Sequence, residues 1–409
     1  MSTNRIDRRK FLASSAVGLS GMLASTSSVF AQENFLSTSK KAVRIGVIGT
    51  GKRGLGLINT IAESVPQLQV VACCDLIPEN LQAALQKAGK KAKGYTDYEK
   101  LLADRNVDAV IVSTPLYLHY PMAVAALERN KHVYVEKSMA FTIKQALDMV
   151  RRVRESNLVL QVGFQYRNFP LYHKVKEIIQ KGTLGGYSVE CQYNRAADWR
   201  YPVKDPSQEK LINWRLYRDL CGGPLSELCA HQIDIVGYLV GSRPAKTVGI
   251  GGIDFFDDGR TTHDNVRTIY EYENKVKAAY TSVYANEGNP YQIRVIGQHA
   301  TIEIGRSNAF IYTQSKNPKQ TLGIVDGVTG ATLTNDEPGK KVQIPYLEPG
   351  EKRVEPTLYA LQDFYNCIAD GGTPLSNVST GRDSAIAICM GLDAMETGET
   401  QHWKPEYSI

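Results

Sequence analysis

A short apolar segment followed at once by a glycine-rich turn constrains this chain more than any other feature of its sequence. Residues 43–48 (VRIGVI) are typical of a buried parallel strand, and the following GTGKRG places Gly49, Gly51 and Gly54 at G-x-G-x-x-G spacing. A helical pattern, LGLINTIAES, comes directly after it. In this context the glycines let the backbone approach a pyrophosphate, and the helix N-terminus meets its negative charge. The segment therefore predicts a dinucleotide site.

The acidic end of the next apolar segment favours NAD as that dinucleotide. LQVVACCD ends in Asp75, 26 residues after Gly49, near the place where a carboxylate binds the ribose hydroxyls of the adenosine half. A carboxylate there repels the 2′-phosphate of NADP. Lys52 and Arg53, in the glycine-rich turn, keep NADP open as the alternative.

Strand and helix patterns continue to alternate through the first half of the chain. Further strands are predicted at 107–115, 131–138 and 158–164, and helices at 78–88, 97–104, 120–130 and 142–157. The alternation predicts a Rossmann domain over residues 42–160, an α/β fold with a doubly wound parallel sheet. Ligands of such sheets lie beyond the carboxyl ends of the strands, where the sequence places Ser113, Thr114, Pro115, Glu136, Lys137 and Gln165.

The end of one of these strands, in KHVYVEKSMAF, carries a candidate catalytic residue. Lys137 is suited to direct its ammonium at a hydroxyl or carbonyl beside the nicotinamide, with Glu136 positioning it. A strand-end salt bridge or a solvated pair remains the alternative reading of the same dipeptide.

A second candidate centre lies in CGGPLSELCAHQIDIVGYLVG. Glu227 and His231 are four residues apart and share one face of the predicted helix, and Asp234 follows on much the same side. A histidine can take a hydroxyl proton near neutral pH, and a nearby carboxylate can orient it. A capping or core histidine is the alternative.

Together these motifs resemble the Gfo/Idh/MocA oxidoreductases. GTGKRG, the acidic strand end, STP…H, HVYVEKS, VGFQYRNFP and GGP…E…HQID occur in the family's order over residues 43–395. The resemblance implies an NAD-dependent enzyme in which Lys137 and His231 are catalytic, with Glu227 where the family has aspartate. It adds His119 to the cofactor site, and it implies an α/β second domain over 161–395 with a large, mostly antiparallel sheet that mediates dimers or tetramers.

Three positions depart from the family pattern. Ser138 replaces the proline that follows the lysine, Leu116 replaces an asparagine after Thr-Pro, and Glu227 lengthens the carboxylate arm. None of these changes removes the lysine or the histidine. The resemblance therefore still implies a catalytically competent site.

The second half of the chain is predicted to form mainly strands, followed by two helices near its end. Strands are predicted at 187–196, 265–273, 276–285 and 291–305, a loop or hairpin excursion at 314–350, helices at 356–371 and 379–398, and a tail at 396–409. Aromatic and basic side chains between the strands suit a wall that contacts sugar. The residues named for that wall and for other substrate contacts are Tyr166, Arg167, Trp199, Arg200, Tyr201, Trp214, Arg215 and Asp234.

The N-terminus predicts export of the folded protein. DRRKFLASSAVG places Arg8-Arg9 before a soft apolar segment, and VFA before Gln32 offers a cleavage site, so residues 1–31 read as a twin-arginine signal peptide for delivery to the periplasm. An uncleaved amphipathic arm is the alternative. Cleavage lowers the formal net charge from +6 to +3, which favours neither nucleic acid nor an anionic membrane as a partner. No membrane span is predicted in the mature chain.

The seven cysteines are odd in number and lack C-x-x-C spacing, and the histidines are scattered. We therefore predict no structural disulfide and no metal site.

The leading functional prediction is an NAD-dependent oxidoreductase that acts on a secondary alcohol of a sugar or glycoside, for example a glycoside 3-dehydrogenase. One alternative is an NAD-dependent glycosidase that forms a transient keto-sugar and needs a base such as Tyr166, Tyr193 or Tyr201. A non-catalytic sugar-binding relative is the third reading.

Overall fold

The computed structural model describes residues 42–285, 288, 290–313 and 341–408, which belong to one compact unit. The predicted signal peptide and residues 314–340 of the predicted excursion lie outside the described residues. Within the described ranges, no helix is long and apolar enough to cross a bilayer. All seven cysteines are described, and none of them is in a disulfide.

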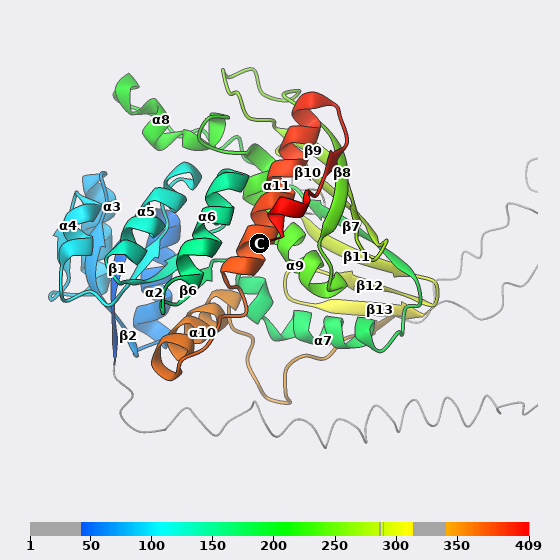
Figure 1. Cartoon of the computed structure of the whole chain (residues 1–409), viewed down its shortest axis with the longest axis horizontal. Helices are drawn as coiled ribbons and strands as arrows, with labels where there is room; N and C mark the ends of the chain where they lie inside the picture. Colours follow the sequence, from blue (N-terminus) through cyan, green and yellow to red (C-terminus); the bar gives the residue numbers. More distant parts are fainter. Residues whose placement is uncertain (1–41, 286–287, 289, 314–340, 409) are drawn as a thin grey trace, which may run out of the picture. The chain divides into compact units, whose positions relative to one another are not determined.

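The first half of the chain forms a six-stranded sheet with the strand order β3-β2-β1-β4-β5-β6 (Figure 1). Every pairing in it is parallel, which confirms the predicted doubly wound sheet. The strands are β1 (Val43–Ile48), β2 (Leu68–Cys74), β3 (Lys93–Tyr95), β4 (Ala109–Val112), β5 (His132–Val135) and β6 (Leu160–Val162). The helices between them are α2 (Lys52–Ser64), α3 (Pro78–Ala88), α4 (Tyr98–Ala103), α5 (Leu116–Glu128) and α6 (Ile143–Arg154).

Both faces of this sheet are buried, and the strand β4 shows why its sequence is continuously apolar. Val110 and Val112 pack into one hydrophobic cluster with residues of α5 and α6, while Ala109 and Ile111 pack into the other with residues of α2. Successive side chains of a strand point to opposite faces, so a strand covered on both sides needs apolar residues at every position. The second cluster also contains side chains of α10 (Pro356–Asp370), so a helix near the end of the chain covers part of the first sheet.

The second half of the chain forms a nine-stranded sheet in the order β14-β13-β12-β11-β7-β10-β9-β8-β15. Only β10 and β7 run parallel, which confirms the predicted large, mostly antiparallel sheet. Its strands are β7 (Tyr187–Tyr193), β8 (Pro244–Gly252), β9 (Asn265–Tyr272), β10 (Lys277–Val283), β11 (Tyr291–Gly297), β12 (Ala300–Ile304), β13 (Ala309–Thr313), β14 (Lys341–Gln343) and β15 (Gln401–His402). The longer helices are α7 (Pro170–Gln180), α9 (Ala230–Val240) and α11 (Val378–Thr397), and α11 crosses between the two sheets in Figure 1.

Several elements differ from the predicted ones for identifiable reasons. The helix α5 begins at Leu116 and continues through Pro121. Its predicted start was residue 120, because proline is favoured in the first turn of a helix. Predicted strand 291–305 is a hairpin of two strands. The strand β8 was not predicted because its glycines weaken the strand pattern.

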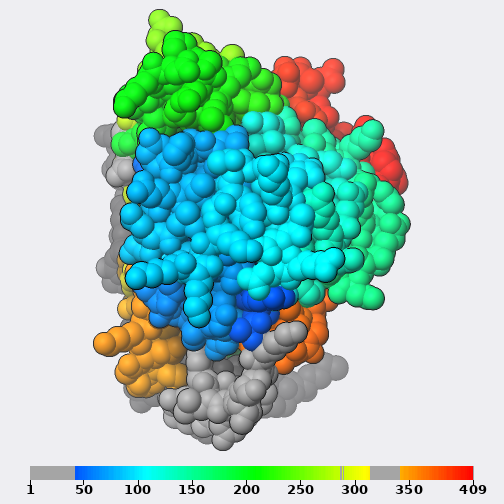
Figure 2. Space-filling model, turned by 90° about the vertical axis from the view of Figure 1, so that its left-hand side faces the viewer, coloured from blue at the N-terminus to red at the C-terminus, as the bar shows by residue number. Residues whose placement is uncertain are grey.

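An excursion of residues 194–216 leaves the second sheet and reaches the first domain. It contains the short helix α8 (Glu209–Ile212), which is drawn above α5 in Figure 1. In Figure 2 the green atoms near residue 200 border the blue and cyan atoms of the first domain. Contact is direct, since Lys52 Nζ lies 3.2 Å from the hydroxyl oxygen of Tyr201. The excursion thereby closes one side of the site described next.

Candidate functional site

A cleft of about 1110 Å³ runs between the carboxyl ends of β1, β2, β4 and β5 and the second domain. Most of the sequence-predicted site residues line it: Gly49, Gly51, Lys52, Arg53, Asp75, Ser113, Thr114, Pro115, His119, Glu136, Lys137, Gln165, Trp199, Tyr201, Trp214, Arg215, Glu227 and His231. Gly54, Tyr166, Arg167, Arg200 and Asp234 do not line it. Tyr193, named as a candidate base, is also in the wall.

The three glycines of the first turn have different roles. A Cβ at Gly49, whose φ is +84°, would lie 2.8 Å from the backbone of Ser113, and a Cβ at Gly54 would lie 2.1 Å from the carbonyl oxygen of Gly49. These two glycines are therefore required by the turn itself. The nearest atom to a Cβ at Gly51 is the Nδ2 of Asn80, 3.8 Å away, so Gly51 leaves open space for a ligand.

We expect Gly54→Ala to weaken NAD binding about 10- to 100-fold, because the overlap with the Gly49 carbonyl must be relieved by moving the phosphate-binding turn. Isothermal titration calorimetry of the folded protein with NAD measures this change. Gly56→Ala in the same helix is the matched control, since nothing lies within 4 Å of its added Cβ. Wild-type NAD affinity in Gly54→Ala would refute this role for the turn.

The acid predicted to bind ribose is held at the edge of the cleft by backbone groups. Asp75 accepts hydrogen bonds from the backbone N–H of Thr50 at 2.7 Å and from that of Ile77 at 2.8 Å. The basic residues of the turn have other contacts. Lys52 meets Tyr201, and Arg53 Nε donates to Glu136 Oε1 at 2.6 Å.

Unsatisfied polar atoms in the same wall fit a bound dinucleotide. The hydroxyl oxygen of Thr114 and the side-chain carbonyl oxygen of Gln165 are buried and have no hydrogen-bond partner among the described residues. Buried polar atoms are normally paired, so a ligand with complementary groups would complete both. With the open space at Gly51, these atoms make the cleft chemically suited to NAD.

The ammonium of Lys137 is held by Glu227, from 90 residues further along the chain. Its Nζ donates to the backbone oxygen of Glu227 at 3.0 Å and lies 3.5 Å from Oε1 of the same residue. The prediction that Glu136 positions this ammonium is wrong, because the Glu136 carboxylate pairs with Arg53. The hydrogen bond that Glu136 accepts from Lys137 comes from its backbone N–H, at 3.3 Å, and not from its ammonium. The Lys137–Ser138 peptide bond is cis.

Glu227 is the centre of a buried ion cluster at this end of the cleft. It lies in a π-helical turn, Leu225–Cys229, and its Oε2 accepts from Arg215 Nε at 2.8 Å. Burial raises the pKa of Glu227, but the charges of Lys137 and Arg215 outweigh burial and hold that pKa at about 2. Glu227 is therefore an anion that fixes two cations in place.

His231 follows at the start of α9, and it has no carboxylate partner among the residues that the structure describes. Its ring packs against Tyr166 and Phe164, with centroids 5.5 and 6.2 Å away, and its buried Nδ1 has no hydrogen-bond partner among the described residues. Burial, together with the positive charges of Lys137 and Arg53, lowers the pKa of His231 well below its ordinary value. The imidazole is therefore neutral at neutral pH and can accept a proton.

The expectation that Glu227 or Asp234 orients His231 is wrong. The Glu227 carboxylate is taken by Lys137 and Arg215, and Asp234 accepts from Arg167 Nε at 2.9 Å and from Ser384 Oγ at 2.9 Å. Each carboxylate pairs with a cation from a distant segment of the chain. Residue spacing along one helix cannot predict such a pairing. Arg167 and Asp234 therefore form a buried pair outside the cleft.

Two more predicted residues take supporting positions. Both ring nitrogens of His119 face backbone oxygens, with Nδ1 2.7 Å from that of Ser138 and Nε2 2.9 Å from that of Thr114. His119 therefore ties together two loops of the cofactor site. Tyr166 lies behind His231 as packing.

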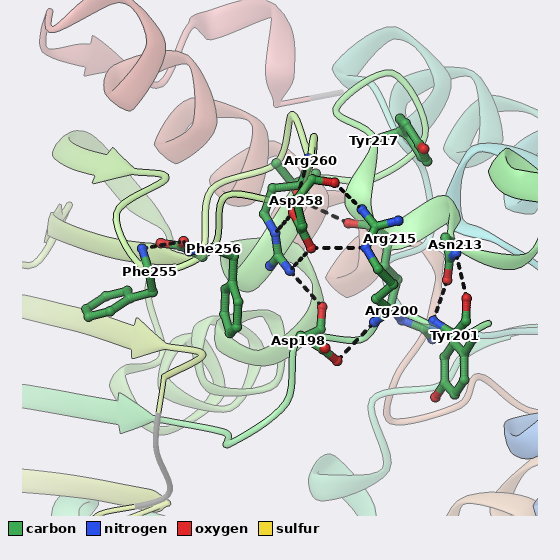
Figure 3. Close-up of polar contacts among 12 residues, drawn as sticks. Asp198, Arg200, Tyr201, Asn213, Arg215, Tyr217, Phe255, Phe256, Asp258 and Arg260 are labelled. Carbon is green, nitrogen blue, oxygen red and sulfur yellow. Dashed lines mark hydrogen bonds and ion pairs between the residues drawn. The ribbon is translucent and has the colours of Figure 1, made fainter. Parts of the chain in front are cut away.

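A polar network fixes the excursion against the second domain, as Figure 3 shows. The fully buried side chain of Arg260 donates to the backbone oxygen of Asp198 at 3.0 Å and pairs with Asp258 at 2.7 Å. Arg200 pairs with Asp258 as well, and so it supports the wall from behind and does not face the cleft. Asn213 accepts from the backbone N–H of Tyr201 and donates to its carbonyl oxygen.

Sequence reasoning missed some residues of the cleft. Arg195 lines its wall and belongs to the same aromatic and basic segment as Trp199, but it was not among the residues named for the sugar-contacting wall. Asn80, Asp97 and Tyr98 line the end near Asp75. Their position after neighbouring parallel strands is the only signal that would have found them.

Comparison with known proteins gives a consistent family assignment. A profile described as "Oxidoreductase family, NAD-binding Rossmann fold" matches residues 43–164, and one described as "Oxidoreductase family, C-terminal alpha/beta domain" matches residues 176–401. Inositol 2-dehydrogenase of Salmonella typhimurium is 34% identical over 51% of this chain and 57% of its own length. Levoglucosan dehydrogenase of Pseudarthrobacter phenanthrenivorans is 28% identical over 50% of this chain and 52% of its own length. The chain thus spans little more than half the length of these relatives.

Solved structures share the fold along nearly their whole length. Levoglucosan dehydrogenase in complex with NADH superposes with a TM-score of 0.72 at 20% identity, covering 88% of this chain and 99% of that one. Aldose-aldose oxidoreductase from Caulobacter crescentus, complexed with glycerol, gives a TM-score of 0.69 at 20% identity over 89% and 100%. At this identity the likeness establishes the fold. The two profiles show that the chain belongs to the Gfo/Idh/MocA oxidoreductase family and carries that family's NAD-binding Rossmann domain.

Proposed function

We propose that this protein oxidises a secondary alcohol of a sugar or polyol, with NAD as the hydride acceptor. The observation that carries the proposal is the placement of a fixed ammonium, Lys137, and a neutral imidazole, His231, in the same cleft as the glycine-rich turn. The dehydrogenase names of the relatives, which refer to inositols and levoglucosan, support an alcohol on a ring as the substrate class.

The proposed chemistry assigns one proton and one hydride. His231 takes the hydroxyl proton, because its lowered pKa leaves a free nitrogen lone pair at neutral pH. Lys137 donates a hydrogen bond to the same oxygen and stabilises the negative charge that develops there. NAD, when bound, supplies the carbon that accepts the hydride from the alcohol carbon. Glu227 keeps the Lys137 ammonium in position, and the alcohol leaves as a ketone.

A panel of methyl glycosides and inositols, followed by NMR in deuterated water with added NAD, tests this function. A ketone that appears together with NADH is the expected result, with the methyl group retained where the substrate is a methyl glycoside. A 3-keto glycoside would identify a glycoside 3-dehydrogenase. Free sugar with deuterium beside the oxidised carbon, and no net NADH, would instead mean an NAD-dependent glycosidase. Sugar binding with no turnover would mean a non-catalytic relative.

We also propose that the protein is exported by the twin-arginine route with its dinucleotide already bound. The support is the sequence DRRKFLASSAVG together with a fold that binds a cofactor made in the cytoplasm. The double substitution Arg8→Lys and Arg9→Lys is expected to leave an uncleaved protein in the cytoplasm, as measured by cell fractionation and the mass of the N-terminus. Periplasmic, processed protein from the double variant would contradict this proposal.

We further propose a homo-oligomer, dimeric or tetrameric, that assembles through the nine-stranded sheet. Exposed apolar residues on β8 and β9 support it: the exposed fractions are 44% for Val248, 79% for Ile250 and 53% for Ile269. Ile250→Lys is expected to shift the molar mass from light scattering toward the monomer. Leu375→Lys, which replaces an exposed apolar residue outside the sheet, is the control. A monomeric wild type, or an Ile250→Lys variant of unchanged mass, would contradict the assignment.

A further inference from the structure

Two guanidinium groups are held against one indole ring in the wall of the cleft. The guanidinium carbon of Arg195 lies 5.4 Å from the ring centre of Trp199, and that of Arg215 lies 5.2 Å from it. Arg215 also stacks on Trp214, at 4.1 Å. The Trp199 ring packs on Tyr284 as well, at 4.8 Å. Trp199 therefore supports two cations and has little free face left on which a sugar could stack.

These cations are incompletely neutralised by the protein. Arg215 uses only its Nε on Glu227, and its terminal nitrogens have no hydrogen bond to any described residue. Arg195 has no hydrogen bond or ion pair from its side chain within the described part of the chain, and it is exposed to the cleft. The Glu227 carboxylate is also paired with the ammonium of Lys137. Lys137 and Arg215 thus share the Glu227 carboxylate, and Arg195 adds a third positive charge to the wall, although like charges brought close together repel one another.

This positive wall belongs to the reacting end of the cleft. Arg215 is bonded to the carboxylate that holds the Lys137 ammonium, whereas the glycine-rich turn that suits a pyrophosphate has its own cation, Lys52. His231 lines the same cleft, where burial is the main cause of its lowered pKa and the positive charges of Lys137, Arg53 and Arg306 lower that pKa further.

We propose that the substrate is an anionic sugar, whose carboxylate or phosphate is bound by Arg195 and Arg215 beside Lys137 and His231. The inference rests on the proposed function and names the substrate class of the same site. Guanidinium groups match both anions because their N–H donors form a planar fork that can make paired hydrogen bonds. Such a ligand would supply the negative charge that the wall lacks.

Isothermal titration calorimetry of the NADH-loaded protein tests the proposal, and it does not depend on turnover. The probes are methyl glucoside, methyl glucuronide and glucose 6-phosphate. At least one anionic sugar is expected to bind about 10- to 100-fold more tightly than the neutral glucoside, the range for a charged hydrogen bond. The two anionic probes distinguish a carboxylate from a phosphate. Arg195→Gln is expected to reduce the preference to about threefold or less.

Lys204→Gln is the matched control, because it removes an exposed cation from the same excursion but not from the cleft. It is expected to keep the wild-type preference. Equal affinity for neutral and anionic probes would overturn the proposal, even if neutral sugars are oxidised and the proposed function stands. An Arg195→Gln variant that loses NADH affinity, yet keeps the preference for the anionic sugar, would overturn it as well, because the cation would then serve the cofactor.

Discussion

Replacing Lys137 with alanine is expected to lower kcat for sugar oxidation by about 10²- to 10⁴-fold. Its ammonium is the only described cation that both lines the cleft and contacts Glu227 through two atoms, at 3.0 and 3.5 Å. Without it, the negative charge that develops on the reacting oxygen has no fixed donor. Initial rates of NADH formation, at saturating sugar and NAD, measure the effect.

The Lys137→Ala loss should appear in the chemical step and leave the affinity for NAD nearly unchanged, because Gly51 and Asp75 remain in place. Lys144→Ala, which removes an exposed lysine of α6, is the control and should keep wild-type kcat. A Lys137→Ala enzyme that is folded, binds NAD and retains more than one tenth of kcat would exclude Lys137 from the chemistry.

Replacing His231 with asparagine is expected to lower kcat/KM by a similar factor, about 10²- to 10⁴-fold, because the base is removed while polarity and approximate size are kept. The wild-type pH profile should carry the signature of this base. Burial and the nearby charges of Lys137 and Arg53 lower the pKa of His231 well below 6.5, and only the neutral ring accepts a proton. The rate of oxidation should therefore stay on its plateau through pH 6.5 and fall only at lower pH.

The matched control for this pair of measurements is His402→Asn, at an exposed histidine on β15. It should alter neither the rate nor the profile. An acid limb centred near or above pH 6.5 in the wild type would show that His231 is not desolvated as described. A His231→Asn variant with a wild-type rate would remove His231 from the proposed mechanism.

The first domain was predictable because its strands are buried on both faces. Such strands appear in the sequence as continuous apolar segments, and β4 (Ala109–Val112) is one of them. The edge strand β3 (Lys93–Tyr95) was missed since it is short and largely exposed. In the second domain β8 was missed because its exposed face and its glycines break the apolar alternation.

Membership of the site was also largely predictable, since parallel strands bring their carboxyl ends to one edge. The pairing within the site was not predictable. Glu227 was expected to orient His231 and instead binds Lys137 and Arg215, while Asp234 binds Arg167. These partners come from segments far apart in the chain, so spacing along one helix cannot indicate them. The π-helical turn before α9 likewise has no clear signature in the sequence.

The most direct test of the central claim is to follow the hydride itself. The protein is incubated with NAD and a sugar deuterated at its ring carbinol carbons, and the reduced cofactor is analysed by mass spectrometry. The account predicts one deuterium in each NADH formed, with a matching amount of ketone, and neither product with Lys137→Ala on the same timescale. A sugar that is bound or cleaved while no deuterium enters the cofactor would contradict the assignment of this cleft to net alcohol oxidation.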